Sequence, residues 1–204
     1  MKVAVLGGTG AFGSALARRL VEAGIDVTIG SRDAERATAT AAELGARGLA
    51  NADAVHDVDL IVLSVDATAA LATAAELADA LGETPVLSVA SELRVEKGSA
   101  FPTDDQLSLA ERTQQLLRGP VVAGLHSLAA SSLAEGKTEG DAFVCGDDES
   151  AKAAALDLAA TLVTGRALDA GPLASARALE AMTAVIVNLN RRYRGHAGLQ
   201  IVGL

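Results

Sequence analysis

The sequence predicts an α/β protein built on a doubly wound, mainly parallel sheet, with a small C-terminal portion of helices and short strands. Strand-like and helix-like patterns alternate through the first half of the chain. A glycine-rich turn joins the first expected strand to the first expected helix. The run at 59–65 is apolar on both faces, as an interior parallel strand should be. Together these features indicate a Rossmann-type sheet.

The first half of the chain supplies most of this sheet. Short apolar runs that stop at glycines predict strands, and Ala-rich segments with apolar residues at helical spacing predict helices. The expected order is strand 2–6, helix 10–23, strand 25–30, helix 33–44, strand 59–65, helix 67–81, strand 85–89 and strand 121–125.

The alternation breaks between residues 91 and 105, where Gly98, Pro102 and polar neighbours predict a long loop. Such a loop in a compact domain is usually a lid or a binding loop. Beyond it the pattern predicts helix 107–117, strand 142–145, helix 149–164, strand 166–170 and helix 173–193.

Composition excludes several classes of protein. The formal net charge is −9, and no basic face of the kind that binds nucleic acid is visible. The single cysteine, Cys145, fits a reducing cytoplasm. The chain starts directly with a strand, without a signal-peptide pattern, and no apolar run approaches the roughly 20 residues that span a bilayer. We therefore expect a cytoplasmic protein with neither a nucleic-acid nor a membrane partner.

The glycine-rich turn has the G-x-G-x-x-G pattern of dinucleotide sites, in the context of a strand followed by a helix. Gly8 suits the tight turn, Gly10 allows the backbone to approach a pyrophosphate, and Gly13 allows close packing of helix on strand. The pyrophosphate would lie on the free N–H groups of the helix N-terminus. The expected cofactor-binding residues of this turn are Gly8, Thr9, Gly10, Ala11, Phe12 and Gly13.

The end of the second strand indicates which dinucleotide binds. An NAD site places Asp or Glu there for the ribose 2′-hydroxyl, whereas this chain has Ser31 and Arg32. Both can bind a 2′-phosphate, and Arg36 can add a second cation one turn further on, with Asp33 capping the helix. The sequence thus predicts NADP(H), an NADP-binding Rossmann domain over 1–125, and a smaller substrate-side portion over 126–204 packed against it.

Several strings resemble the family of F420-dependent NADP reductases over the whole chain, namely 5–10 (VLGGTG), 29–33 (IGSRD), 144–148 (VCGDD), 168–173 (LDAGPL) and 188–191 (NLNR). This resemblance implies hydride transfer between NADP(H) and the 5-deazaflavin coenzyme F420. It also implies that His126 and Leu128, within the string 125–130 (LHSLAA), lie against the deazaflavin ring. Ser64, Val65 and Ala90 would lie where the nicotinamide meets this second substrate.

Two acidic residues depart from the family pattern near that meeting point. Asp66 stands where the family commonly has proline, and Glu92 stands in a run that is proline-rich in the family. Both would oppose the anionic tail of F420 unless they point away from it.

Direct hydride transfer requires two rings held in contact with water excluded, rather than acid–base side chains or a metal. The sequence accordingly predicts no metal site. A reductase of a flavin or of a small imine or carbonyl substrate is an alternative, with Asp66, Glu92 or His126 as proton donor for the latter two. A non-catalytic NADPH-binding redox sensor is another.

The last expected helix carries one apolar stripe, formed by Leu173, Ala176, Leu179, Met182, Val185, Ile186 and Leu189. The stripe can pack on the sheet of its own chain or form a dimer contact, which the resemblance favours. The apolar tail 201–204 likewise needs burial on the chain or on a partner. We expect a homodimer.

Overall fold

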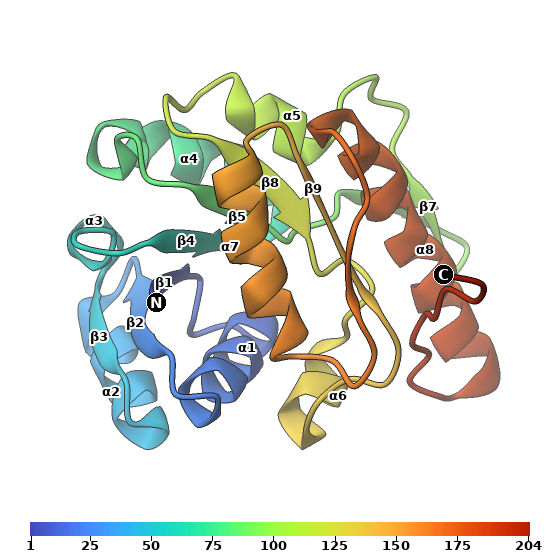
Figure 1. Ribbon diagram of the computed structural model, residues 1–204, viewed down its shortest axis with the longest axis horizontal. Coiled ribbons are helices and arrows are strands. Elements are labelled where there is room, and N and C mark those ends of the chain that lie inside the picture. Colours follow the sequence, from blue (N-terminus) through green and yellow to red (C-terminus); the bar gives the residue numbers. More distant parts are fainter.

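The computed structural model describes residues 1–204, and its centre is a mixed eight-stranded sheet (Figure 1). The strand order is β10-β9-β8-β5-β4-β1-β2-β3. Six neighbouring strands from β3 to β8 are parallel, and β9 pairs with β8 in the antiparallel direction. The strands are β1 Lys2–Leu6, β2 Asp26–Ser31, β3 Arg47–Ala50, β4 Leu60–Leu63, β5 Val86–Ser88, β8 Val121–Gly124, β9 Ala142–Gly146 and β10 Ala167–Asp169. The predicted doubly wound, mainly parallel sheet is therefore confirmed.

Helices cover both faces of the sheet and bury an apolar core on each. One core packs α1 (Ala11–Glu22), α2 (Ala34–Leu44), α6 (Ala130–Glu135) and α7 (Glu149–Ala160). The other packs α3 (Asn51–Ala54), α4 (Ala67–Leu81), α5 (Leu109–Gln114), the 3-10 turn η1 (Leu173–Ser175) and α8 (Ala176–Tyr193). Strand β4 is buried at every residue, which explains its continuous apolar run.

The strand order places a topological switch point between β1 and β4. Chain connections leave these adjacent strands for opposite sides of the sheet, so a crevice opens beyond their carboxyl ends. Ligands of open α/β sheets bind in this crevice. The glycine turn after β1 and residues 64–66 after β4 both lie there.

The structure contains five short elements that the sequence did not predict. Strand β3 and helix α3 follow α2, where no element was expected, and the short helix α6 follows β8. The segment predicted as a loop over 91–105 contains the hairpin of β6 (Leu93–Glu96) and β7 (Ser99–Pro102). These elements are four to six residues long, so they carry too little periodicity to be recognised. Helix α5 also ends at Gln114, three residues before the predicted end.

The two C-terminal strings of the resemblance lie side by side at the far edge of the sheet. Strand β10 pairs with β9, and the Gly146 N–H donates to the Gly171 carbonyl. Asp147 accepts a hydrogen bond from the Leu173 N–H, while Asp148 caps α7 through the Ala151 N–H. The acids of residues 144–148 therefore fix the starts of two helical segments.

The C-terminal residues are tied back to the same edge of the sheet. The buried Asp141 carboxylate accepts from the Ile201 N–H and pairs with Arg166, whose guanidinium also donates to the Ile201 carbonyl. Its pKa is lowered to about 2, chiefly by hydrogen bonds from Arg166. The division of the chain at residue 125 stays a prediction. No helix has the length and apolarity needed to cross a membrane.

Candidate functional site

The turn after β1 requires glycine for two separate reasons. Gly7 has a φ of +80°, in the left-handed region that favours glycine, and thus forms the tight turn that the sequence analysis attributed to Gly8. A Cβ on Gly13 would lie 2.4 Å from the Gly7 carbonyl oxygen, so only glycine lets α1 start this close to the turn. No side chain caps the first turn of α1, which leaves its N–H groups free to bind an anion.

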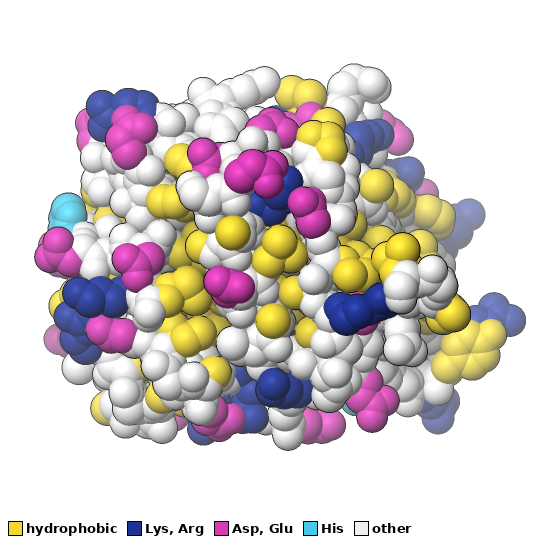
Figure 2. Space-filling view, viewed as in Figure 1, with side chains coloured by type: hydrophobic (Ala, Val, Ile, Leu, Met, Phe, Trp, Pro, Cys, Tyr) yellow, Lys and Arg dark blue, Asp and Glu magenta, His cyan; other side chains and the backbone are white.

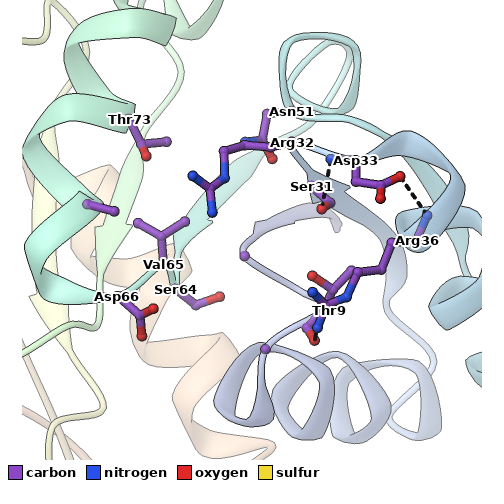
Figure 3. Close-up of a pocket in the computed structure, with 13 residues that line it drawn as sticks. Thr9, Ser31, Arg32, Asp33, Arg36, Asn51, Ser64, Val65, Asp66 and Thr73 are labelled. Atoms are coloured by element: carbon purple, nitrogen blue, oxygen red, sulfur yellow. Dashed lines mark hydrogen bonds between the residues drawn. The ribbon is translucent and has the colours of Figure 1, made fainter.

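A cluster of hydrogen-bond donors faces this helix N-terminus from the end of β2. Ser31 ends the strand, and Asp33 caps α2 by accepting from the N–H groups of Glu35 and Arg36. The Arg36 guanidinium donates to the Thr9 carbonyl over 3.3 Å, and Arg32 extends across the space toward α4 (Figure 3). Neither Arg32 nor Arg36 takes part in any of the ion pairs. The two cations are therefore available to a bound anion.

These groups line a cavity of about 300 Å³ at the switch point. Its wall comes from the glycine turn, the end of β2, the first turn of α2, the start of α3, the residues after β4 and the first half of α4. The lining residues are Gly7, Thr9, Gly10, Ser31, Arg32, Asp33, Arg36, Asn51, Ser64, Val65, Asp66, Ala69 and Thr73. Asn51 is nine-tenths buried, and its Oδ1 has no hydrogen-bond partner.

Seven of the predicted cofactor-binding residues thus lie together: Thr9, Gly10, Ser31, Arg32, Arg36, Ser64 and Val65. Gly8, Ala11, Phe12, Gly13 and Ala90 do not line this cavity. No sequence pattern indicated Asn51, Ala69 or Thr73 as part of this cavity. Asn51 could have been found only by recognising β3, because it follows that strand directly.

His126 lies just past the end of β8, after a residue under backbone strain. Leu125 has a φ of +65°, which is rare for a branched side chain. Strained backbone conformations of this kind cluster at functional sites. His126 is 6% exposed and Leu128 is also buried. Burial lowers the pKa of His126 to about 4, partly offset by the Ala90 backbone, and neither ring nitrogen has a hydrogen-bond partner within the chain. The imidazole is therefore neutral at neutral pH.

A chain of hydroxyl groups fixes the backbone at His126. The Thr183 hydroxyl, from α8, donates to the His126 carbonyl over 3.0 Å and lies 2.7 Å from the Ser91 hydroxyl. Ser91 follows Ala90 beyond the end of β5. The loops after β5 and β8 are thereby connected through one residue of α8.

A second cavity, of about 450 Å³, opens beyond Ser91. One wall runs along η1 and α8 through Ala174, Arg177, Ala178 and Ala181, and Glu180 of the same helix also lines it. The other wall consists of Glu92, Pro102, Thr103, Leu107, Ser108, Leu109 and Arg112.

The two acidic residues noted in the sequence have different surroundings. Glu92 forms an ion pair with Arg112, which neutralises its charge at the second cavity. Asp66 lines the first cavity at the start of α4 and has no ion-pair partner. The concern that both acids repel an anionic ligand therefore remains only for Asp66.

Comparison with known proteins gives one consistent result. Residues 2–92 match the family described as NADP oxidoreductase, coenzyme F420-dependent. The chain is 34% identical to the F420-dependent NADP reductase of Methanothermobacter thermautotrophicus over an alignment of 222 positions. This alignment covers 100% of the chain and 96% of the relative. The chain is also 33% identical to the F420-dependent NADP reductase of Methanocaldococcus jannaschii, with 100% and 99% covered.

Solved structures agree with this assignment. A candidate F420-dependent NADP reductase from Arthrobacter sp. FB24 superposes with a TM-score of 0.84 at 26% identity, covering 100% of this chain and 99% of that one. A reductive aminase from Aspergillus terreus reaches 0.69 at 22% identity over 62% of its own length, which shows a shared fold alone. With relatives this similar across its full length, the chain belongs to the family of F420-dependent NADP reductases.

Proposed function

We propose that this chain is an NADP-dependent oxidoreductase of the 8-hydroxy-5-deazaflavin:NADP⁺ type, which transfers a hydride between NADP(H) and coenzyme F420. One observation carries this proposal. Two cations without an ion-pair partner, Arg32 and Arg36, line the cavity beside the uncapped N–H groups at the start of α1. Full-length similarity to F420-dependent NADP reductases supports the second substrate.

The residues of the first cavity fit NADP(H). Ser31, Arg32 and Arg36 supply a hydroxyl and two guanidinium groups for a 2′-phosphate, and no carboxylate stands at the end of β2 where an NAD site would have one. The N–H groups at the start of α1 would hold the pyrophosphate. We place the nicotinamide toward Ser64, Val65 and Ala90, which follow the ends of the neighbouring strands β4 and β5.

The reaction we propose consumes NADPH, F420 and a proton and yields NADP⁺ and reduced F420. The bound nicotinamide supplies the hydride, and the protein positions and desolvates the reacting rings. His126 and Leu128 line neither cavity in this structure. The imidazole is neutral and the Leu128 side chain is apolar, so neither would add a charge if the deazaflavin ring lay against them. Removing the imidazole should lower turnover and leave NADPH binding nearly unchanged.

We propose the second cavity as the site of the deazaflavin, with its acidic tail along Arg177. The walls combine small apolar side chains with this cation, which forms no ion pair, whereas Arg112 is paired with Glu92 and Asp105. Glu92 lies two residues beyond Ala90, so this cavity begins beside the proposed nicotinamide position.

We also propose that the protein is a homodimer and that it works in the cytoplasm. Val185, Leu189 and Tyr193 recur every four residues along α8 and are exposed, and Val202 and Leu204 of the tail are 90% and 84% exposed. Figure 2 shows apolar side chains reaching the surface near the C-terminus, beside α8. This surface supports a contact with a second copy. The free, buried thiol of Cys145 suits a reducing compartment.

A substrate comparison tests the proposed activity. The purified chain is mixed with NADPH or NADH and with F420, flavin mononucleotide or a cyclic imine, and reduction of each acceptor is followed. We expect fast reduction of F420 with NADPH. Preferred reduction of the flavin or the imine would support the alternative reductases, and tight NADPH binding without turnover of any acceptor would support a sensor.

A further inference from the structure

The hairpin of β6 and β7 is held against α8 by side chains that imitate a neighbouring strand. The Asn188 side chain accepts a hydrogen bond from the Ala100 N–H and donates one to the Ala100 carbonyl, each over 2.8 Å. Both backbone groups at the outer edge of β7 are thereby satisfied by one amide. One helical turn further on, Arg191 donates to the Gly98 carbonyl over 2.6 Å. Asn188 and Arg191 on this face of α8 thus both bind the backbone of the hairpin.

Both ends of this hairpin border the second cavity. Glu92 precedes β6, Pro102 ends β7, and both line the wall that faces α8. Across the cavity, Arg177 and Ala181 lie on α8. Asn188 follows Ala181 by seven residues, or about two turns, and therefore continues the same face of the helix. The two hydrogen bonds from Asn188 to Ala100, which we call the Asn188 clamp, and the cavity wall therefore lie on one surface of α8.

The hairpin adds little to the core of the protein. Ala100 is its one buried residue, and the other residues of its strands are exposed or half-buried. No residue of the hairpin or of α8 lines the first cavity. Loss of the Asn188 clamp should therefore loosen one wall of the second cavity while the chain stays folded and the NADP(H) site stays intact.

We propose that Asn188 is a positioning residue for the second substrate. By fixing the hairpin on α8 it sets the width of the second cavity, and with it the affinity for the deazaflavin. This inference rests on the proposed function, since it takes F420 as the occupant of that cavity.

The test compares Asn188→Ala with Asn190→Ala. Asn190 lies on the same helix, is also half-buried, and accepts one hydrogen bond from the Ala197 N–H of the tail instead of from the hairpin. For Asn188→Ala we expect faster amide exchange over residues 93–102 and a KM for F420 raised about tenfold, as for the loss of two hydrogen bonds. The KM for NADPH should stay within about twofold. Asn190→Ala should change neither the hairpin exchange nor the KM for F420.

Asn188→Gln provides a milder variant in case the alanine variant does not fold. It keeps the amide donor and acceptor on a side chain one methylene longer, so an intermediate KM for F420 is expected. Faster hairpin exchange with an unchanged KM for F420 would make the clamp purely structural and overturn the inference, as would unchanged exchange. Failure of the unmodified chain to reduce F420 would instead overturn the proposed function, and this inference with it.

Discussion

The guanidinium of Arg32 reaches from the end of β2 into the first cavity without an acidic partner. A hydrogen bond to a charged group contributes about 1.5–3 kcal/mol, so Arg32→Ala should raise the KM for NADPH by about 10- to 100-fold. The KM for NADH, which lacks the 2′-phosphate, should hardly change. Arg18→Ala, which removes an exposed arginine of α1 outside both cavities, is the control. An equal loss of affinity for both dinucleotides would contradict a phosphate-binding role.

His126 couples the stability of the fold to pH. Burial lowers its pKa from 6.5 to about 4, so the unfolded chain binds more protons between these two values. The stabilisation is complete above about pH 6.5 and is lost as the pH falls toward 4. Between about pH 7.5 and about pH 5 this side chain should cost the fold about 2 kcal/mol. Urea unfolding at both pH values should show a shallower pH dependence in His126→Gln; identical slopes would mean that the imidazole is not buried neutral.

Among the elements, helix α2 begins at the first cavity, where the cofactor is proposed to bind. Asp33 caps it, and Arg36 in its first turn contacts the glycine turn at Thr9. Asp33→Ala should destabilise the protein by about 1 kcal/mol and also raise the KM for NADPH, because the first turn frays. Asp148→Ala, which removes a similar cap from α7, should lower thermal stability by a comparable amount. A raised KM for NADPH in both variants would show that stability alone explains the effect.

The long elements and the arginines of the first cavity could be predicted from the sequence, whereas short or exposed elements could not. Residues 3–6 of β1 and the whole of β4 are buried, which leaves an unbroken apolar run in each. Ser31, Arg32 and Arg36 follow directly from the end of β2, so recognising that strand located them. Asn188 and Thr183 act through contacts with residues about 90 positions away, such as Ala100 and Ser91, and no local pattern records such partners.

Helix α8 shows how one periodic stripe can serve two surfaces. Leu173 of η1, with Ala176, Leu179 and Ile186 of the helix, is buried in the core, while Val185 and Leu189 of the same predicted stripe are exposed. The sequence spacing could not separate these sets, because residues one turn apart differ only slightly in direction around the helix.

For the molecule as a whole, the exposed stripe on α8 predicts self-association. Analytical ultracentrifugation of the unmodified protein should give twice the 20.5 kDa mass of the chain. Leu189→Glu places a charge in the middle of the apolar surface and should yield monomers, whereas Glu76→Gln, on α4, should not. A monomer mass for the unmodified protein would contradict the proposed dimer.

The path of the hydride tests the central claim most directly. The chain is mixed in a stopped-flow instrument with F420 and NADPH that carries deuterium at the transferred C4 position. We expect rapid loss of the visible absorbance of F420, a slower rate with deuterium than with hydrogen, and deuterium at C5 of the reduced product. Reduction without deuterium at C5, or no reduction of F420 while NADPH binds tightly, would contradict direct transfer between the two substrates.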